Sequence, residues 1–140
     1  MSRAVLLDTN LLIGAFEPEE GNEQHALAKK RLRALLLDPE VKLAITPLIR
    51  YEVLRGARRV SIAKLDEKLD DFQEFDVRGA DARRAAEIFR MAQQQGIKLD
   101  KHKFDVFHCV CAQLNQLEIE SADSDILRIQ KLLKSEDNNA

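Results

Sequence analysis

The sequence predicts an α/β fold, in which helices cover both faces of a central parallel sheet. Short apolar runs of strand length alternate with longer segments of helix length along the whole chain, which is the pattern that βαβ units produce. The chain has 140 residues, the size of one domain with a single core. We therefore expect one domain over residues 1–134, followed by a polar tail over 135–140.

The first half of the chain contains signals for two strands and four helices. Strands are expected at 3–7 and 41–45, and helices at 10–16, 23–37, 47–56 and 62–72. The continuous apolar first run is typical of a buried central strand. Pro39 ends the long second helix, and Pro47 suits the first turn of the third. The apolar face of the long helix is expected to carry Leu27, Leu32, Leu35 and Leu36.

The second half of the chain continues the alternation. Strands are expected at 74–77 and 117–121, and helices at 82–95, 105–114 and 124–133. Gly79 precedes the first of these helices and Gly96 closes it, because glycine readily adopts the conformation in which helices end. Together the two halves predict a sheet of four strands.

The composition is that of a folded globular protein. Hydrophobic residues make up 45% of the chain and charged residues 33%, which argues against disorder. No apolar stretch approaches the roughly 20 residues that span a bilayer, and no signal peptide opens the chain. We expect a cytoplasmic protein with no membrane partner. The net charge of −2 argues against a general nucleic-acid binder, although it allows a local basic surface.

Four acidic residues stand at strand ends or close to helix starts. Asp8 follows the first expected strand directly, and Asp123 follows the last one. Ligands bind beyond the carboxyl ends of parallel strands, so both acids fall at that edge of the sheet. Glu52 and Asp105, near the starts of neighbouring helices, are expected to face the same cleft.

A cluster of four carboxylates indicates a divalent-metal site. Two charges about 4 Å apart repel by about 4 kcal/mol at an effective dielectric constant of about 20, so the cluster must take up protons or cations. Oxygen ligands favour Mg²⁺ or Mn²⁺ over Zn²⁺, which prefers His and Cys. Each acid taken alone is more simply a helix cap or a solvated charge, but the position that all four share favours the metal site.

The four acids lie in motifs that together resemble those of PIN-domain ribonucleases. The motifs are LDTN at 7–10, EVLRG at 52–56, FDVF at 104–107 and SADSDI at 121–126. Their order and spacing cover about residues 3–130, and no single motif would be specific. Length and motif detail look most like VapC, the toxin of type II toxin–antitoxin pairs. The third motif departs from the family, because Phe107, His108 and Cys109 stand where small apolar residues are usual.

The resemblance implies a three-layer α/β/α PIN-like fold with a central parallel sheet of four strands, a fifth edge strand being short or absent. It also implies an endoribonuclease that hydrolyses RNA phosphodiester bonds with one or two Mg²⁺ or Mn²⁺ ions. Asp8 and Asp105 would bind metal directly, and Glu52 and Asp123 partly through water. Asp125 is an alternative ligand, but Asp123 lies nearer the strand end. The implied partners are an RNA substrate, a cognate antitoxin and a second copy of the chain in a homodimer.

Several residues beside the motifs have two interpretations. Thr9 and Asn10 either hold a metal-bound water or a phosphate, or cap a helix. Ser121 either orients the acids or is a plain strand-end hydroxyl, which we favour. His108 stands almost one turn after Asp105 as a ligand or proton donor, or packs in the core, which we favour.

The basic residues and the cysteines complete the list of candidates. Two groups could contact phosphates, namely Arg50, Arg55, Arg58, Arg59 and Lys64, and then Lys101, His102 and Lys103. For the first group a solvated helix face is the favoured interpretation. Neither His25 nor His102 has a partner that the sequence identifies. Cys109 and Cys111 are expected to be buried and reduced.

Other function classes fit the motifs less well. A haloacid-dehalogenase-like phosphatase needs a second aspartate where this chain has Asn10. A response-regulator receiver domain needs a phosphoacceptor aspartate that the expected strands at 41–45 and 74–77 do not offer. A PIN domain that acts in RNA maturation, or that binds RNA or protein without cleavage, is the remaining alternative. Loss of an acid would be the signature of the non-cleaving form, and all four acids are present.

Overall fold

The computed structural model describes residues 2–121 and 123–138, with side chains as far as Lys134. The strands are β1 (Arg3–Leu7), β2 (Val41–Ile45), β3 (Gln73–Glu74) and β4 (Glu118–Glu120). The helices are α1 (Thr9–Phe16), α2 (Glu23–Leu37), α3 (Pro47–Gly56), α4 (Ile62–Leu69), α5 (Gly79–Gln94), α6 (Lys103–Leu114) and α7 (Ser124–Asn138). A 3₁₀ turn at Asp100–His102 precedes α6.

The strands form one parallel sheet in the order β3-β2-β1-β4. Leu6 of β1 pairs with Ala44 on one side and with Ile119 on the other. This register brings the carboxyl ends of β1 and β4 together, and the Asp8 amide donates a hydrogen bond of 3.1 Å to the Glu120 carbonyl. The expected parallel sheet is confirmed, and the described residues contain four strands.

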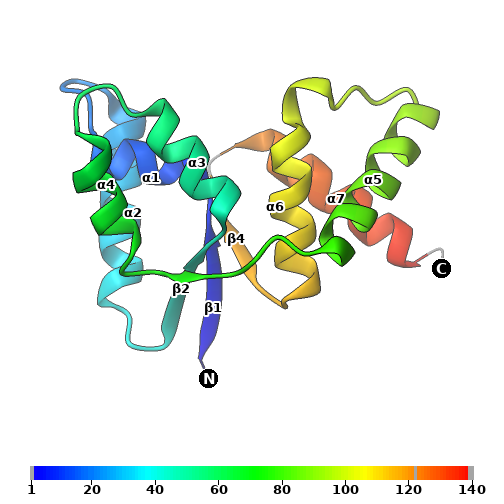
Figure 1. Cartoon of the computed structure of the whole chain (residues 1–140), viewed down its shortest axis with the longest axis horizontal. Helices are drawn as coiled ribbons and strands as arrows, with labels where there is room; N and C mark the ends of the chain where they lie inside the picture. The colour runs from blue at the N-terminus through cyan, green and yellow to red at the C-terminus, as the bar shows by residue number, and fades with distance from the viewer. Residues whose placement is uncertain (1, 122, 139–140) are drawn as a thin grey trace.

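Helices cover the two faces of the sheet (Figure 1). The hydrophobic core on one side joins β1 and β2 to α1, α2 and α3, with fully buried Leu6, Leu12 and Ile49 among its members. A second core lies among α5, α6 and α7 around Ile88 and Ile129. Because Ile119 of β4 packs against both cores, the sheet is the middle layer of a three-layer α/β/α fold.

Some expected element boundaries were wrong for identifiable reasons. The strand expected at 74–77 is only Gln73–Glu74, at the exposed edge of the sheet. Helix α4 ends at Leu69 instead of residue 72. Helix α5 starts at Gly79, three residues early, because the Arg78 amide donates a hydrogen bond to the Asp81 carboxylate and caps the helix there. Helix α7 continues to Asn138, so the first part of the segment expected as a tail is helical.

The buried face of α2 is narrower than expected. Leu32 and Leu35 are buried, whereas Leu27 is 65% and Leu36 58% exposed. Positions 32 and 35 lie on one stripe of the helix, Leu36 lies at its border, and Leu27 is rotated to another face. The prediction for the other two leucines of this face was therefore wrong.

Two further sequence expectations concern the cysteines and the membrane. Cys109 and Cys111 are both buried and form no disulfide, as expected. Burial raises the pKa of both thiols, which keeps them protonated. Within the described part of the chain, every helix is too short or too polar to cross a bilayer.

Candidate metal centre

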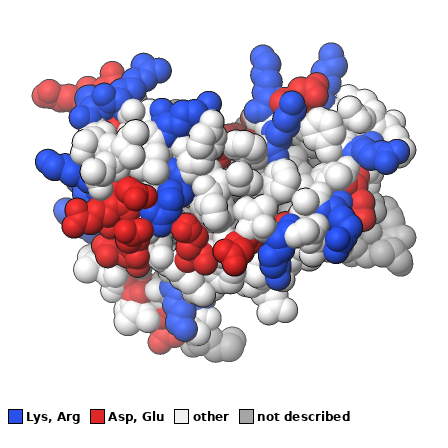
Figure 2. All heavy atoms as spheres, viewed as in Figure 1, with Lys and Arg blue, Asp and Glu red and all other residues white. Residues whose placement is uncertain are grey.

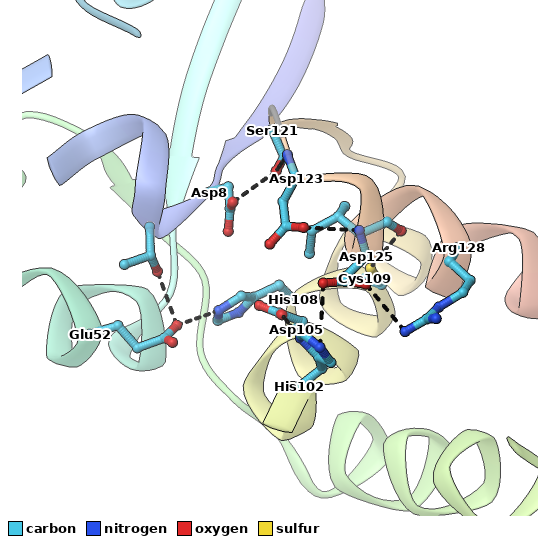
Figure 3. A network of polar contacts seen from close by, with 12 residues as sticks. Asp8, Glu52, His102, Asp105, His108, Cys109, Ser121, Asp123, Asp125 and Arg128 are labelled. Carbon is cyan, nitrogen blue, oxygen red and sulfur yellow. Dashed lines mark hydrogen bonds and ion pairs between the residues drawn. The ribbon is translucent and has the colours of Figure 1, made fainter. Parts of the chain in front are cut away.

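The acidic side chains converge where β1 and β4 end (Figure 3). Asp8 leaves β1 and precedes α1, but its side chain makes no capping hydrogen bond. Glu52 lies on α3, in the second turn rather than near the start, and Asp105 lies in the first turn of α6. The structure therefore brings these three acids together from three different elements, as the sequence led us to expect.

Asp8, Asp105 and His108 form a group with the geometry of a metal site. One ligand atom from each residue lies within 4.8 Å of the ligand atoms of the other two. Asp8 is 4% exposed and His108 2% exposed, while Asp105 is half-buried. The sequence favoured a packing role for His108, and its ring is indeed buried, but the structure also places it inside the acid cluster.

Two side chains hold the Glu52 carboxylate in place. The Thr9 hydroxyl donates a hydrogen bond of 3.0 Å to Glu52 Oε1, and His108 Nε2 lies 2.6 Å from the same oxygen. The other ring nitrogen, Nδ1 of His108, is buried and has no hydrogen-bond partner among the described residues. Buried polar atoms are rarely left unpaired, so this nitrogen suits a ligand that the chain itself does not supply.

Ser121 links the first strand-end acid to the second. Its hydroxyl donates a hydrogen bond of 2.8 Å to Asp8 Oδ2 and accepts one of 3.0 Å from the Asp123 amide. The Asp123 carboxylate then accepts a hydrogen bond of 2.9 Å from the Asp125 amide. Ser121 therefore orients the acids, and the simpler interpretation that we favoured for it was wrong.

A second set of contacts surrounds Asp125 at the start of α7. His102 Nδ1 lies 3.0 Å from Asp105 Oδ2, and its Nε2 lies 3.3 Å from Asp125 Oδ2. Arg128 Nη2 lies 3.2 Å from the other Asp125 oxygen. Asp125 is thus engaged by two basic side chains, and within the described residues Asp123 has no such partner. These contacts support the preference for Asp123 over Asp125 as the acid left for a metal.

The electrostatics differ between the acids. Burial raises the pKa of Asp8, and the charge of Asp105 acts in the same direction. Burial likewise raises the pKa of Asp105, helped by the charge of Glu52. Burial also acts upward on Glu52, but the hydrogen bond and charge of His108 outweigh it, so the pKa of Glu52 lies below its usual value. Asp8 and Asp105 are therefore the carboxylates whose negative charge the fold leaves least compensated.

The donor set fits a divalent ion. Two carboxylates and one imidazole, with ligand atoms within 4.8 Å of one another, are groups that Mg²⁺, Mn²⁺ and related ions accept in proteins, with nitrogen favouring the transition metals. The charges that raise the pKa of Asp8 and Asp105 are also charges that a bound cation would neutralise. Asp8, Asp105 and His108 are accordingly the residues that would hold such an ion.

The opposite ends of α1 and α3 are joined by a second contact. The Glu17 carboxylate, at the end of α1, accepts hydrogen bonds of 2.8 Å from the amides of both Arg58 and Arg59, just beyond α3. A Cβ atom on Gly56 would come within 2.9 Å of Ile13 Cδ1, so a larger residue there would push the end of this side chain aside. The two helices that carry Thr9 and Glu52 are therefore fixed at both ends.

The basic patch expected along α3 and α4 is divided in the structure. Arg50 is bound within the fold by Glu74, Asp66 and Asp70. Arg59 is paired with Glu17 and lies at the far end of α3. Arg50 and Arg59 are therefore engaged in contacts within the fold, and neither the favoured solvated face nor the alternative of phosphate binding describes these two arginines.

The surface above the acids is indented between α3 and α6 (Figure 2). Acidic atoms are visible inside the indentation, and lysine and arginine side chains gather on both of its sides. Among the expected basic residues, Arg55, Lys101 and Lys103 belong to the elements on these sides, and all three are exposed. A polyanion would thus meet positive charge at the rim and negative charge at the floor.

The sequence missed the roles of the histidines. His102 bridges Asp105 and Asp125 although the sequence identified no partner for it. His25 Nδ1 accepts a hydrogen bond of 2.9 Å from the Glu19 amide and lies outside the site. Asn10 is exposed, and neither it nor Thr9 is the capping residue of α1. For His108, the spacing of three residues after Asp105 had offered a place near the site as the less favoured interpretation.

Known proteins share this architecture. A chain in a toxin–antitoxin complex from Klebsiella pneumoniae is 26% identical, with a TM-score of 0.61 over 86% of this chain and 87% of that chain. VapBC2 from Rickettsia felis, bound to a promoter DNA fragment, gives 16% identity and a TM-score of 0.65 over 90% and 92% of the two chains. FitAcB from Neisseria gonorrhoeae gives 18% identity and a TM-score of 0.64 over 91% and 93%.

The sequence comparisons agree with the fold. No curated protein matches this chain in sequence. The family model of the PIN domain matches residues 5–132, a range that includes every acid of the site. On this match and on the α/β/α architecture, the chain belongs to the PIN domain family.

Proposed function

We propose that this protein is a metal-dependent endoribonuclease and the toxin of a toxin–antitoxin pair. Nuclease activity is typical of the PIN domain family. The observation that carries the proposal is the convergence of Asp8, Asp105 and His108, with ligand atoms within 4.8 Å of one another (Figure 3). An RNA phosphodiester could enter from the rim, where its charge is favoured, and reach the donor group below.

The proposed metal is Mg²⁺ or Mn²⁺, one or two ions held by Asp8, Asp105 and His108, with Glu52 and Asp123 nearby. When bound, such an ion lowers the pKa of a coordinated water and stabilises charge on the reacting phosphate. Glu52 is positioned by the Thr9 hydroxyl and by His108 to accept a proton or hold a water. Ser121 keeps Asp8 turned toward the same space.

The antitoxin is proposed from the neighbours. The chains of similar fold come from complexes in which toxin and antitoxin are bound together. A protein that places a basic side chain among Asp8, Asp105 and Glu52 would compensate the charge that a metal otherwise neutralises. The homodimer expected from the resemblance stays a prediction.

The decisive experiment is cleavage of end-labelled total RNA by the wild type and by Asp8→Asn, with Mg²⁺, Mn²⁺ or EDTA. We expect discrete fragments from the wild type alone, which disappear in EDTA. Thermal unfolding with and without the ions gives an independent reading, because a ligand at a hundred times its Kd adds about 2.7 kcal/mol of stability. The asparagine variant should lose most of that gain.

A second outcome would favour the binding-only alternative. If the wild type is stabilised by the ions but cuts no RNA after removal of any co-purified protein, the chain is a metal-binding PIN domain without this activity. Equal cleavage by the wild type and the asparagine variant would identify a contaminating nuclease and contradict the assigned role of Asp8.

A further inference from the structure

Two aromatic side chains stand directly beside the acids of the site. Tyr51 precedes Glu52 on α3, and Phe104 precedes Asp105 on α6. Their ring centroids lie 6.1 Å apart with an interplanar angle of 74°. The pair therefore spans from α3 to α6, the two elements that border the indentation in Figure 2.

Arg55 completes this group one turn further along α3. Its guanidinium carbon lies 5.4 Å from the centroid of the Tyr51 ring, a cation–π contact. We call Tyr51, Arg55 and Phe104 the aromatic rim. Within the described residues Arg55 makes no ion pair, in contrast to Arg50 on the same helix. Its exposed guanidinium can therefore contact a ligand, although its charge also acts on Glu52.

The aromatic rim is not part of the hydrophobic core. Tyr51 is 52% exposed, whereas Phe72, in the stacked pair with Phe16, is buried. Tyr51 and Phe104 belong to neither core cluster. Tyr51 is exposed and Phe104 half-buried, and together they offer a ligand beside the candidate site a flat, apolar surface with a charged neighbour.

We propose that the aromatic rim binds an unpaired nucleobase of the RNA by stacking, and so selects single-stranded or looped substrate. This inference rests on the proposed ribonuclease function. Aromatic rings and guanidinium planes stack on bases with little preference for base identity, and bases inside a duplex are not accessible to them. A nucleotide stacked on Tyr51 would present its phosphate towards the acids that adjoin the rim.

A protein segment is the competing occupant, since tyrosine and arginine also anchor protein interfaces. The position of the rim favours RNA. Both aromatic residues are sequence neighbours of candidate site acids, and Lys101 and Lys103, exposed just before Phe104, extend the positive charge along the border. A ligand with a flat base and adjacent phosphates matches the aromatic, cationic and metal-binding groups together.

The test uses the full-length Asp8→Asn protein, which we expect not to cut RNA, and a single-stranded RNA oligonucleotide carrying one 2-aminopurine. Stacking quenches the fluorescence of this base, and titration with Mg²⁺ present gives the affinity. We expect saturable quenching, an affinity lowered about tenfold by the additional Tyr51→Ala change, and near-normal binding with Tyr51→Phe. Leu37→Ala is the matched control, because it truncates an exposed side chain on α2, away from the rim.

Several outcomes separate the possibilities. Unchanged quenching and affinity in Tyr51→Ala would overturn the proposal, as would an oligonucleotide duplex that binds as well as the single strand. If Tyr51→Ala weakens antitoxin binding but keeps the RNA affinity, the aromatic rim binds a protein, and the proposal is overturned as well. If the wild type and Tyr51→Ala cleave RNA equally well, the stacking inference is wrong and the nuclease function stands. If quenching depends on Tyr51 but the wild type cleaves no RNA, the nuclease function is wrong and the stacking inference stands.

Discussion

Asp8 and Asp125 stand at the carboxyl end of the same sheet but are held by different kinds of partner. Asp8 is buried and receives a neutral serine hydroxyl, and its close neighbours include a second acid whose charge raises its pKa. Asp125 lies nearer the surface and is paired with His102 and Arg128. We call Asp8, Glu52 and His108 the inner group, and His102, Asp125 and Arg128 the outer group. Asp105 touches both.

The comparison indicates that the two groups have different roles. The outer group brings its own positive charges, so its negative charge is compensated within the chain. The inner group has neutral hydroxyl donors and one histidine for two buried acids. A site built to receive a cation needs such residual negative charge, while the supporting contacts around it do not. The inner group is therefore the candidate for metal binding and the outer group the candidate for support.

The largest expected contrast is in RNA cleavage. Asp105→Asn should lower the rate by at least about a thousandfold, equivalent to about 4 kcal/mol, because it removes a direct ligand. Asp125→Asn should cost about tenfold, since Asp125 acts on Asp105 only through His102. Single-turnover rates at saturating Mn²⁺ measure both. If Asp125→Asn lowers the cleavage rate as much as Asp105→Asn does, Asp125 is also a metal ligand, and the two groups do not differ in role as proposed.

The next contrast is in the stability of the metal-free protein. His108→Ala leaves the half-buried Glu52 carboxylate without its histidine partner and opens space in a buried position, which should cost about 3 kcal/mol. His102→Ala breaks contacts nearer the surface and should cost less than about 1 kcal/mol. Urea unfolding with EDTA gives both values. Similar losses would mean that the inner histidine does not hold Glu52 as described.

The smallest expected contrast is in the pH dependence of that stability. The raised pKa of Asp8 makes the folded state bind more protons than the unfolded one, so its charge destabilises the fold as pH rises. Asp8→Asn should therefore gain about 1 kcal/mol over the metal-free wild type at neutral pH, and less as the pH falls.

Glu52 should behave in the opposite way. Its lowered pKa contributes stability above its ordinary pKa, and this stability is lost as pH falls. Glu52→Gln should accordingly be less stable than the wild type at neutral pH, with the difference closing in acid. Thermal unfolding in EDTA between about pH 4 and pH 7, around the ordinary carboxyl range, checks both signs. Parallel curves for the two variants would contradict the assigned electrostatics.

The sequence predicted the architecture better than it predicted the contacts. Apolar runs and helix periods located β1, β2, α2 and α3 because burial fixes those patterns locally. The edge strand β3 was overestimated, since two exposed residues at a sheet edge have no strong pattern. The acids that converge in the structure were predicted from their place at strand ends or close to helix starts, and their role as metal ligands stays a prediction.

The partners of those acids depend on contacts between residues distant in the chain. His108 and Glu52 are 56 positions apart, and Ser121 and Asp8 are 113 apart. No local pattern specifies such pairs, so the bonding of His108 and the orienting role of Ser121 were not predicted. The division of the expected arginine patch has the same cause, because the acids that bind Arg50 come from α4, β3 and the turn between them.

The double attachment of α1 to α3 has a consequence for engineering. The position of Glu52 depends on how closely α3 approaches α1, and a residue larger than glycine at position 56 would require Ile13 to move. Grafting the four acids alone onto another scaffold should therefore give a poorly aligned site. A transplant would need the whole helix pair, with the Glu17 anchor at its far end, as one cassette.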